Sequence, residues 1–469
     1  MNLVDLAYTP ALEQARLIRT KEISPLELTQ LYLERIQTLD PHLGSYFTVT
    51  QERALADAKA KTEQLSTTDP EKLPPFFGVP TSIKDLTSVT EMPCTYGIAA
   101  FREKMATFDR AVVARMKQAG FTILGKTATP QLGTVPYTEA PGFPPTRNPW
   151  NRDYTPGGSS GGAAAAVAAG LCAIAQGTDG GGSIRLPAAC CGLVGIKPAR
   201  GRVSSAPLGD CMNGLVTDGP LARTVADAAA MLDIMSGYVT GDPYWLPDPE
   251  PSFLERARTE NPLEPLKIAF ATRIEPMGDA EPICEQAVSE TVNLLEGMGH
   301  TCDRITLDIS ELLESLTAFW YTGLVFANMP PDVLNPLNQE LLKRGQGITG
   351  GQYLQAVTKL QIMARQIVAM FEKFDVLLLP VFMHSTLRVG EWADLSPDEV
   401  LQKSLDWIAP CPLFNVTGQP AIAIPAGFAN GLPIGVQMVG RPAAESTLIA
   451  LAAQLEAAKP WNHNRPPLV

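Results

Sequence analysis

Residues 155–185, with the sequence TPGGSSGGAAAAVAAGLCAIAQGTDGGGSIR, combine an alanine-rich run with two serines that lie beside glycines, Ser159 and Ser183. Glycine loses more chain entropy on folding than other residues, so it is expected here only where the backbone must approach a substrate closely. The glycine run 180–182 directly precedes Ser183 and can present amide N–H groups beside its hydroxyl, as an oxyanion hole requires. The segment therefore predicts acyl transfer with Ser183 as the nucleophile.

The composition is that of a folded, acidic protein. The chain has 469 residues, of which 45% are hydrophobic, so it can bury a core and is too apolar for intrinsic disorder. The net charge of −12, without any basic tract, argues against a nucleic-acid partner. The longest run of small apolar residues, 163–175, is too short to span a bilayer, and the N-terminus lacks the basic region of a signal peptide. We therefore expect no membrane association.

Cysteine usage indicates a reducing compartment. None of the eight cysteines forms a C-x-x-C pair, so the spacing of zinc ligands is absent and we expect neither a metal nor another cofactor. Cys172 lies in an apolar run, as buried thiols do, and the adjacent Cys190 and Cys191 would form a strained disulfide. Reduced thiols in a cytoplasmic protein fit this pattern best.

One match to a nucleotide-binding motif is interpreted as accidental. Residues 120–127 fit the P-loop pattern G-x-x-x-x-G-K-[ST], which requires a strand before the first glycine and a helix that begins at the lysine. Here the apolar residues 121–124 predict a strand inside the pattern, and Pro130 follows soon after it. We therefore do not expect ATP binding.

A serine nucleophile needs a base, and one arrangement that supplies it is that of an α/β-hydrolase. Residues 157–161 match the nucleophile motif G-x-S-x-G around Ser159, with Asp375 and then His384 or His463 downstream in the right order. This motif needs a hydrophobic strand directly before it, whereas the polar, proline-containing residues 148–156 cannot form a central strand. An esterase that uses Ser159 is kept as an alternative.

The other arrangement joins Ser183 to Ser159 and to Lys84, which ends a predicted strand at 78–85. In it the lysine acts as the base through a bridging serine. The motifs are Gly78-Val-Pro with Ile83-Lys84-Asp85, then Gly157-Gly-Ser-Ser-Gly-Gly162, then Gly177-Thr-Asp179 with Gly181-Gly-Ser183-Ile-Arg185, and finally Gly195-Ile-Lys-Pro198. With these motifs the chain resembles the amidase signature family, most strongly over residues 78–227.

The resemblance implies an α/β fold, an α/β/α sandwich around a large mixed β-sheet, and hydrolysis of a carboxamide C–N bond. It implies one amidase domain over 1–469, made of a helical N-terminal arm at 1–75, the catalytic core at 78–227, a variable and pocket-forming region at 240–375, and the C-terminal strands and last helix at 376–469.

The resemblance also implies a role for each motif residue. Ser183 would be the nucleophile, Ser159 the bridging serine after a cis peptide bond from Gly158, and Lys84 the final proton acceptor. The remaining roles fall to an oxyanion hole of Gly180, Gly181 and Gly182, and to surrounding residues that fix the loop and the lysine by hydrogen bonds, Ser160, Thr178, Asp179 and Arg185. The family often has Asn-x-x-Glu after the motif Gly-Lys-Thr, whereas this chain has Ala128-Thr-Pro-Gln131 in the expected wall of the pocket.

Two of these residues can also be interpreted from local chemistry. A lysine has an ordinary pKa of about 10.4, so work as a base near neutral pH needs a bias of roughly 4 kcal/mol against its charged form. Burial supplies that bias if no carboxylate pairs with Lys84, so we expect the side chain of Asp85 to point away. Ser160 precedes the alanine-rich helix, where a serine commonly caps the helix.

The sequence therefore predicts a serine amidohydrolase that acts on a small-molecule amide through an acyl-enzyme. The matched segments around Ser183 and Cys190 are more similar to the free amidases, including the hydrolases of cyclic nylon dimers. An amidotransferase A-type subunit that acts on aminoacyl-tRNA in a complex is the alternative of a different class. Family members are often dimers, so a homodimer is an expectation as well.

Overall fold

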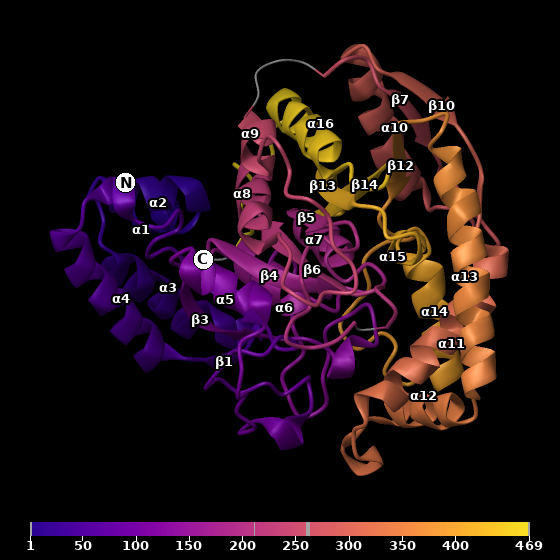
Figure 1. Ribbon diagram of the computed structural model, residues 1–469, viewed down its shortest axis with the longest axis horizontal. Helices are drawn as coiled ribbons and strands as arrows, with labels where there is room; N and C mark the ends of the chain where they lie inside the picture. The colour runs from indigo at the N-terminus through magenta and orange to yellow at the C-terminus, as the bar shows by residue number, and fades with distance from the viewer. Residues whose placement is uncertain (1, 211, 259–262, 468–469) are drawn as a thin grey trace.

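One sheet collects strands from both ends of the chain (Figure 1). The computed structural model describes residues 2–210, 212–258 and 263–467. Within them the sheet has eleven strands in the order β1-β3-β2-β4-β6-β5-β13-β14-β12-β7-β10. The strands are β1 Tyr46–Val49, β2 Pro80–Lys84, β3 Thr122–Thr127, β4 Ile174–Asp179, β5 Val194–Lys197, β6 Thr217–Ala222, β7 Lys267–Phe270, β10 Thr301–Arg304, β12 Val376–Pro380, β13 Ala421–Ala429 and β14 Leu432–Gly440. A separate small sheet joins β8 Arg273–Glu275, β9 Gly278–Asp279 and β11 Leu307–Asp308.

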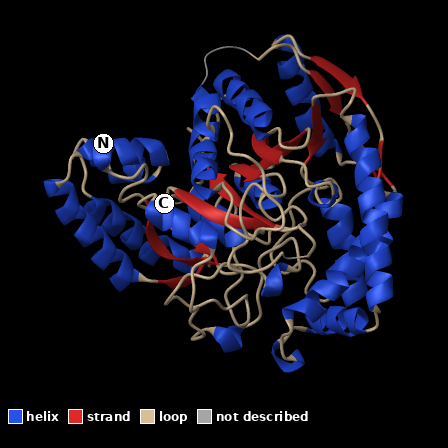
Figure 2. Cartoon of the chain, in the orientation of Figure 1, coloured by secondary structure: helices blue, strands red, loops and turns tan. Residues whose placement is uncertain are grey.

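The helices surround this sheet and leave a central region of loops (Figure 2). They are α1 Leu3–Ala7, α2 Ala11–Arg19, α3 Pro25–Leu39, α4 Gln51–Thr67, α5 Ala111–Gln118, α6 Gly161–Ala168, α7 Arg185–Cys191, α8 Val225–Met235, α9 Phe253–Arg258, α10 Pro282–Gly297, α11 Ser310–Ala327, α12 Pro336–Gln346, α13 Gly350–Met370, α14 Pro397–Ile408, α15 Leu413–Val416 and α16 Glu445–Ala458. No helix in the described ranges is both long enough and apolar enough to cross a bilayer.

The sheet is mixed, and helices cover both of its faces. β2 pairs in parallel with β3 and β4, whereas β13 and β14 form an antiparallel pair. A Cβ atom placed on Gly435 of β14 would lie 2.7 Å from Ala189 of α7, and one on Gly440 would lie 3.2 Å from Leu448 of α16. Because these glycines are five positions apart, they face opposite sides of the strand. The helices α7 and α16 therefore lie on opposite faces, which confirms the α/β/α sandwich.

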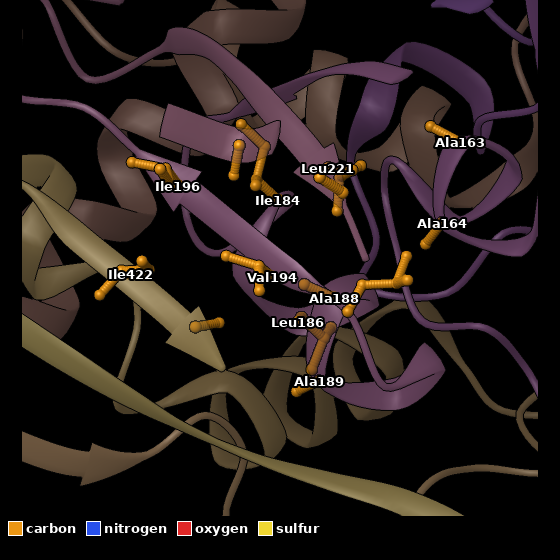
Figure 3. Packing of buried hydrophobic residues seen from close by; sticks show 14 of the residues in the cluster. Ala163, Ala164, Ile184, Leu186, Ala188, Ala189, Val194, Ile196, Leu221 and Ile422 are labelled. Atoms are coloured by element: carbon orange, nitrogen blue, oxygen red, sulfur yellow. The ribbon is translucent and has the colours of Figure 1, made fainter. Parts of the chain in front are cut away.

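Small residues allow α7 to lie close to the strands that carry the glycine loop. Ala188 and Ala189 on this helix are fully buried, and a Cβ on Gly195 of β5 would lie 2.7 Å from Ala188 (Figure 3). Ile184 and Leu221 fill the same region of the core. Close packing of this kind makes the backbone on both sides of Ser183 rigid.

Most of the predicted elements are present, with shifted ends. The capping box of α3 forms, since Glu27 N donates to Ser24 Oγ and Ser24 N donates to Glu27 Oε2. The sequence missed β1, which lies between α3 and α4 of the N-terminal arm and pairs with β3. Thr178 and Asp179 belong to the end of β4, so the glycine loop begins only after Asp179.

The region 240–375, expected to be variable, supplies the helices α11, α12 and α13. They lie together at one side of the molecule, far from the N-terminal helices (Figure 1). A small core between α11 and α12 contains Leu324, Leu341 and Leu342, and Ile98 from the loop after β2 packs into it. The sequence did not predict the helices at 310–346.

Candidate active site

Lys84 lies at the end of β2 and reaches into a closed polar centre. Its side chain is fully buried. The Nζ atom donates hydrogen bonds to Ser159 Oγ at 2.7 Å and to Thr178 Oγ1 at 2.9 Å. Burial lowers the pKa of Lys84 to about 7, against the raising effect of the charges on Asp179 and Asp218. A lysine with this pKa is largely neutral just above pH 7 and can accept a proton.

Asp85, the next residue, forms a separate network. Its Oδ1 accepts from Lys126 Nζ at 3.2 Å, and its Oδ2 accepts from Thr95 N and from the Thr95 hydroxyl. Both ionic side chains are fully buried. The expectation that Asp85 points away from Lys84 is therefore confirmed. Lys126 is the lysine of the false P-loop match, and it lies on strand β3, as the rejection of that motif requires.

Ser159 follows a cis peptide bond from Gly158, as expected. Its hydroxyl accepts from Lys84 Nζ and lies against the turn at Gly133, where an added Cβ would approach Ser159 Oγ to 3.1 Å. Gly158 has no space for a side chain either, because a Cβ there would lie 2.8 Å from the backbone of Tyr137. Close approach of backbone therefore explains the glycines around Ser159.

The expected helix cap at Ser160 is absent, and the hydroxyl has another use. Ser160 is the N-cap residue of α6, but its side chain makes no capping bond. Its Oγ donates to Thr178 O at 3.1 Å and accepts from Thr178 N at 3.3 Å. Its backbone N–H donates to Ser183 O at 3.2 Å. Ser160 thus ties the Ser159 loop to β4 and to the Ser183 loop, in agreement with the role given to it by the resemblance.

The glycine loop begins where β4 ends, at Asp179. Gly182 N donates to Asp179 Oδ1 at 2.7 Å, and Ile184 N donates to Asp179 Oδ2 at 3.1 Å. In the described part of the chain, the backbone N–H groups of Gly180, Gly181 and Ser183 have no hydrogen-bond acceptor. The Ser183 hydroxyl also has no hydrogen-bond partner among the described residues. Gly182 was expected to donate its amide to the oxyanion, but this amide already donates to the Asp179 carboxylate.

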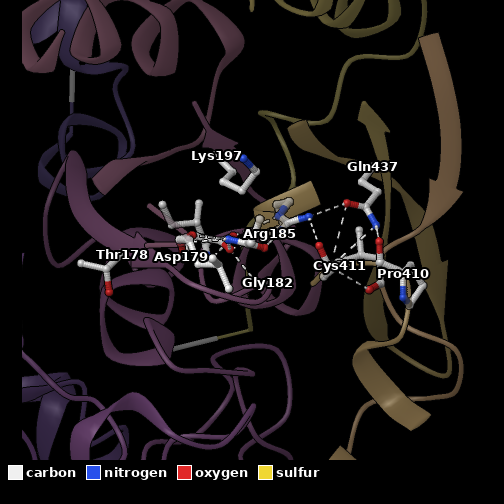
Figure 4. A network of polar contacts seen from close by, with 12 residues as sticks. Thr178, Asp179, Gly182, Arg185, Lys197, Pro410, Cys411 and Gln437 are labelled. Atoms are coloured by element: carbon white, nitrogen blue, oxygen red, sulfur yellow. Dashed lines mark hydrogen bonds and ion pairs between the residues drawn. The ribbon is translucent and has the colours of Figure 1, made fainter. Parts of the chain in front are cut away.

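Arg185 and Asp179 form the buried ion pair that shapes this loop (Figure 4). Arg185 Nε and Nη2 donate to the two carboxylate oxygens at 3.0 and 2.9 Å. Although burial opposes it, the charge of Arg185 holds the pKa of Asp179 well below its usual range. Asp179 is therefore an anion that fixes two loop amides, as the resemblance implied for it and for Arg185.

Two polar residues that the sequence did not indicate, Asn415 and Gln437, complete this network. Asn415 Nδ2 donates to Asp179 O at 3.0 Å and its Oδ1 accepts from Arg185 at 2.6 Å. Gln437 Oε1 accepts from Arg185 Nη1 at 3.0 Å (Figure 4). A glutamine inside the apolar strand β14 was the one available signal, since a buried amide needs a partner.

The arrangement expected of an α/β-hydrolase is not formed. No strand precedes Ser159 within residues 148–156. His384 contacts Ser385 O through Nδ1 and stacks on Trp407, and His463 is exposed. The hydroxyl of Ser159 is bonded to a lysine and not to either histidine.

Comparisons with known proteins agree with this geometry. The profile of the Amidase family matches residues 27–449. A protein of Synechocystis sp. with the name "Putative amidase" is 50% identical over 99% of this chain and 91% of its own length. The 6-aminohexanoate-cyclic-dimer hydrolase of Paenarthrobacter ureafaciens is 35% identical over 100% of this chain and 98% of its own length. A solved structure of 6-aminohexanoate cyclic dimer hydrolase has a TM-score of 0.90, with 33% identity and coverage of 98% of this chain and 99% of that chain.

The matched profile spans the Lys84 strand, both serine loops and the glycine run, and the fold agrees over nearly the whole length of the solved relative. The chain therefore belongs to the Amidase family, the amidase signature enzymes, and is a hydrolase of amide C–N bonds.

Proposed function

We propose that the enzyme cleaves carboxamides through a Ser183 acyl-enzyme, with Ser159 and Lys84 as the proton relay. The observation that carries this proposal is the buried Lys84 Nζ, which lies 2.7 Å from Ser159 Oγ and has a pKa of about 7. A neutral amine bonded to a hydroxyl can draw a proton through it from a second hydroxyl. The backbone bond from Ser160 to Ser183 supports the placement of the nucleophile beside the relay.

The proposed reaction has two halves. Ser183 Oγ attacks the amide carbon while its proton passes to Ser159 Oγ, and the Ser159 proton passes to Lys84 Nζ. The C–N bond then breaks as the relay returns a proton to the leaving amine. In the second half, water attacks the acyl carbon while its proton passes through Ser159 Oγ to Lys84 Nζ. The ester bond then breaks as the relay returns a proton to Ser183 Oγ, and the carboxylic acid is released.

The oxyanion would be held by backbone N–H groups on the glycine loop. Gly180, Gly181 and Ser183 have amides without an acceptor in the described residues, and these are the donors that we assign. Gly182 is left out of this set because Asp179 holds its amide. An oxyanion-hole donor typically contributes about 3 to 4 kcal/mol to transition-state stabilisation.

The substrate is proposed to be a small-molecule amide, linear or cyclic. Two relatives are named for hydrolysis of the 6-aminohexanoate cyclic dimer. Because of this shared name, cyclic and short linear amides of aliphatic acids are the first substrates to test. Aryl amides complete the panel.

The test is covalent labelling of Ser183 by a small alkyl fluorophosphonate, read as a mass increase on the peptide that contains this residue. The wild type should be labelled, and Ser183→Ala should show neither label nor turnover while its circular dichroism spectrum is unchanged. His384→Gln and His463→Gln are the controls and should keep both. Label on Ser159, or a histidine variant that is folded but inactive, would support the esterase alternative and contradict the proposal.

A further inference from the structure

A tight turn after β3 closes over the bridging serine. Residues Gln131–Gly133 form a 3-10 turn in which Leu132 has a φ of 56° and Gly133 a φ of 71°. A Cβ on Gly133 would lie 2.9 Å from Leu86 and 3.1 Å from Ser159 Oγ. Left-handed backbone at a residue such as leucine persists only where the surroundings impose it, and it is concentrated at functional sites.

Gln131 connects this turn to the start of α12. Its Nε2 donates to Val333 O at 2.9 Å, and its Oε1 accepts from Asn335 N at 2.8 Å and from Asn338 Nδ2 at 2.9 Å. Gln131 is only 4% exposed. The amide is therefore used both as a donor and as an acceptor in a site from which water is largely excluded.

Asn338 forms hydrogen bonds with both ends of the same turn. Its Oδ1 accepts from Thr134 Oγ1 at 2.8 Å, and its Nδ2 donates to Gln131 O at 3.3 Å as well as to the Gln131 side chain. Asn338 is fully buried. Trp320 of α11 adds a bond from Nε1 to Thr134 O at 3.2 Å. Both helices of the α11–α12 pair thus hold the turn.

The chemistry of Gln131 distinguishes this chain from the family pattern with glutamate at that position. A carboxylate can only accept, whereas Val333 O needs a donor and Asn338 Nδ2 and Asn335 N need an acceptor. A glutamine satisfies all three partners and a glutamate leaves Val333 O without one. A buried acceptor without a partner is costly, so the structure specifies the amide.

We propose that Gln131 and Asn338 are positioning residues that hold the turn 131–134 against Ser159. Through them the α11–α12 pair, which lies outside the motif-bearing core, fixes the bridging hydroxyl on Lys84. This inference rests on the proposed function, because it concerns the relay from Lys84 through Ser159 to Ser183.

The experiment compares two isosteric variants, Gln131→Glu and Gln339→Glu. Gln339 is the matched control, since its Nε2 donates to Pro331 O and Leu334 O in the same segment but not to the turn 131–134. The readouts are the rate of Ser183 labelling by a small fluorophosphonate, the kcat and KM for an amide, and the melting temperature. A small phosphonate needs the relay and little of the pocket.

Gln131→Glu should slow labelling and lower kcat by about tenfold or more, because displacement of a relay atom by a fraction of an ångström has effects of this order. KM should change little, and Gln339→Glu should label at the wild-type rate. Equal labelling by wild type and Gln131→Glu, or equal slowing in both variants, would overturn the inference. A wild type without label on Ser183 would instead overturn the proposed function.

If Gln131→Glu does not fold, the same measurements are made on a second variant, Thr134→Val. It removes the hydroxyl donor to Asn338 and retains the backbone carbonyl that accepts from Trp320. We expect slower labelling in the same direction as for Gln131→Glu, with an unchanged KM. Labelling at the wild-type rate in a folded Thr134→Val would contradict the role given to Asn338.

Discussion

Lys84 and Asp85 are neighbours in the sequence, yet their side chains lead into two networks that do not touch. Lys84 Nζ bonds to Ser159 and Thr178, while the Asp85 carboxylate bonds to Lys126 and Thr95. Alternation along β2 and the turn that follows it separate a buried amine from the carboxylate that would otherwise keep it charged. This separation allows a lysine to act as a base near neutral pH.

The first prediction concerns the pH dependence of the reaction. In the proposed mechanism the neutral form of Lys84 is the base, and burial lowers the pKa of this lysine to about 7. The value of kcat/KM should therefore rise with pH through about 7 and reach a plateau. Lys197 is the control, because burial also lowers its pKa to about 7 but its Nζ donates to Pro198 O. Lys197→Met should keep the midpoint, and loss of the rise in that variant would contradict the assignment.

The second prediction uses a charge near the base. Asp218 raises the pKa of Lys84, and it forms an ion pair with Arg110 at 3.0 Å. Asp218→Asn should move the midpoint of the pH–rate profile to lower pH, because the charged lysine loses part of its stabilisation. The measurement is kcat/KM from pH 5 to 9. A midpoint that moves to higher pH would contradict this account.

The third prediction is that Lys84→Met stabilises the protein near neutral pH. A lysine with a lowered pKa in the folded state must lose a proton on folding, so the unfolded chain binds more protons between about pH 7 and pH 10.4. Stability of the wild type relative to Lys84→Met should hence increase by about 2 kcal/mol from pH 7 to pH 9. Urea unfolding of both proteins at these pH values measures the difference. A gap that is the same at both values would refute the buried neutral amine.

The fourth prediction concerns the pair behind Lys84. Lys126→Met leaves Asp85 buried without its cation, which should cost about 3 to 5 kcal/mol of the free energy of unfolding. The double variant Lys126→Met with Asp85→Asn removes both charges and should recover part of this loss. Chemical denaturation of the single and double variants is the measurement. Equal losses in both would show that the Asp85 charge is not the cause.

The fifth prediction concerns the glycine loop 180–182. Asp179→Asn removes the anion that binds Arg185 and fixes the amides of Gly182 and Ile184. Loss of a buried partner should lower stability by about 3 to 5 kcal/mol, and disorder of the loop should lower kcat by about a hundredfold or more. Steady-state kinetics below the unfolding temperature separates the two effects. An unchanged kcat in the folded variant would contradict a role of Asp179 in loop geometry.

The sequence determined the fold class and the chemical type of the site because both depend on local signals. The glycines that precede Ser159 and Ser183 mark positions without space for a side chain. A Cβ on Gly158 would meet the backbone of Tyr137, and one on Gly182 would meet the side chain of Cys411. The strand that ends at Lys84 was visible as a short apolar run with a lysine at its end. The capping box of α3 is equally local, because it joins Ser24 to Glu27 three positions later.

Only the tertiary structure decided which groups meet across the chain. Three hydrogen bonds of the site join residues that are far apart in the chain. They connect Ser160 with Thr178 over 18 positions, Asn415 with Asp179 over 236, and Asn338 with Thr134 over 204. Asn415 and Asn338 carry no periodic or motif signal. Ser160, Thr178 and Asp179 lie in the quoted motifs, but only folding brings their hydrogen-bond partners to them. For the same reason the sequence indicated Lys84, Ser159 and Ser183 as candidate residues but gave no sign that α11 and α12 bond to the turn 131–134 beside Ser159.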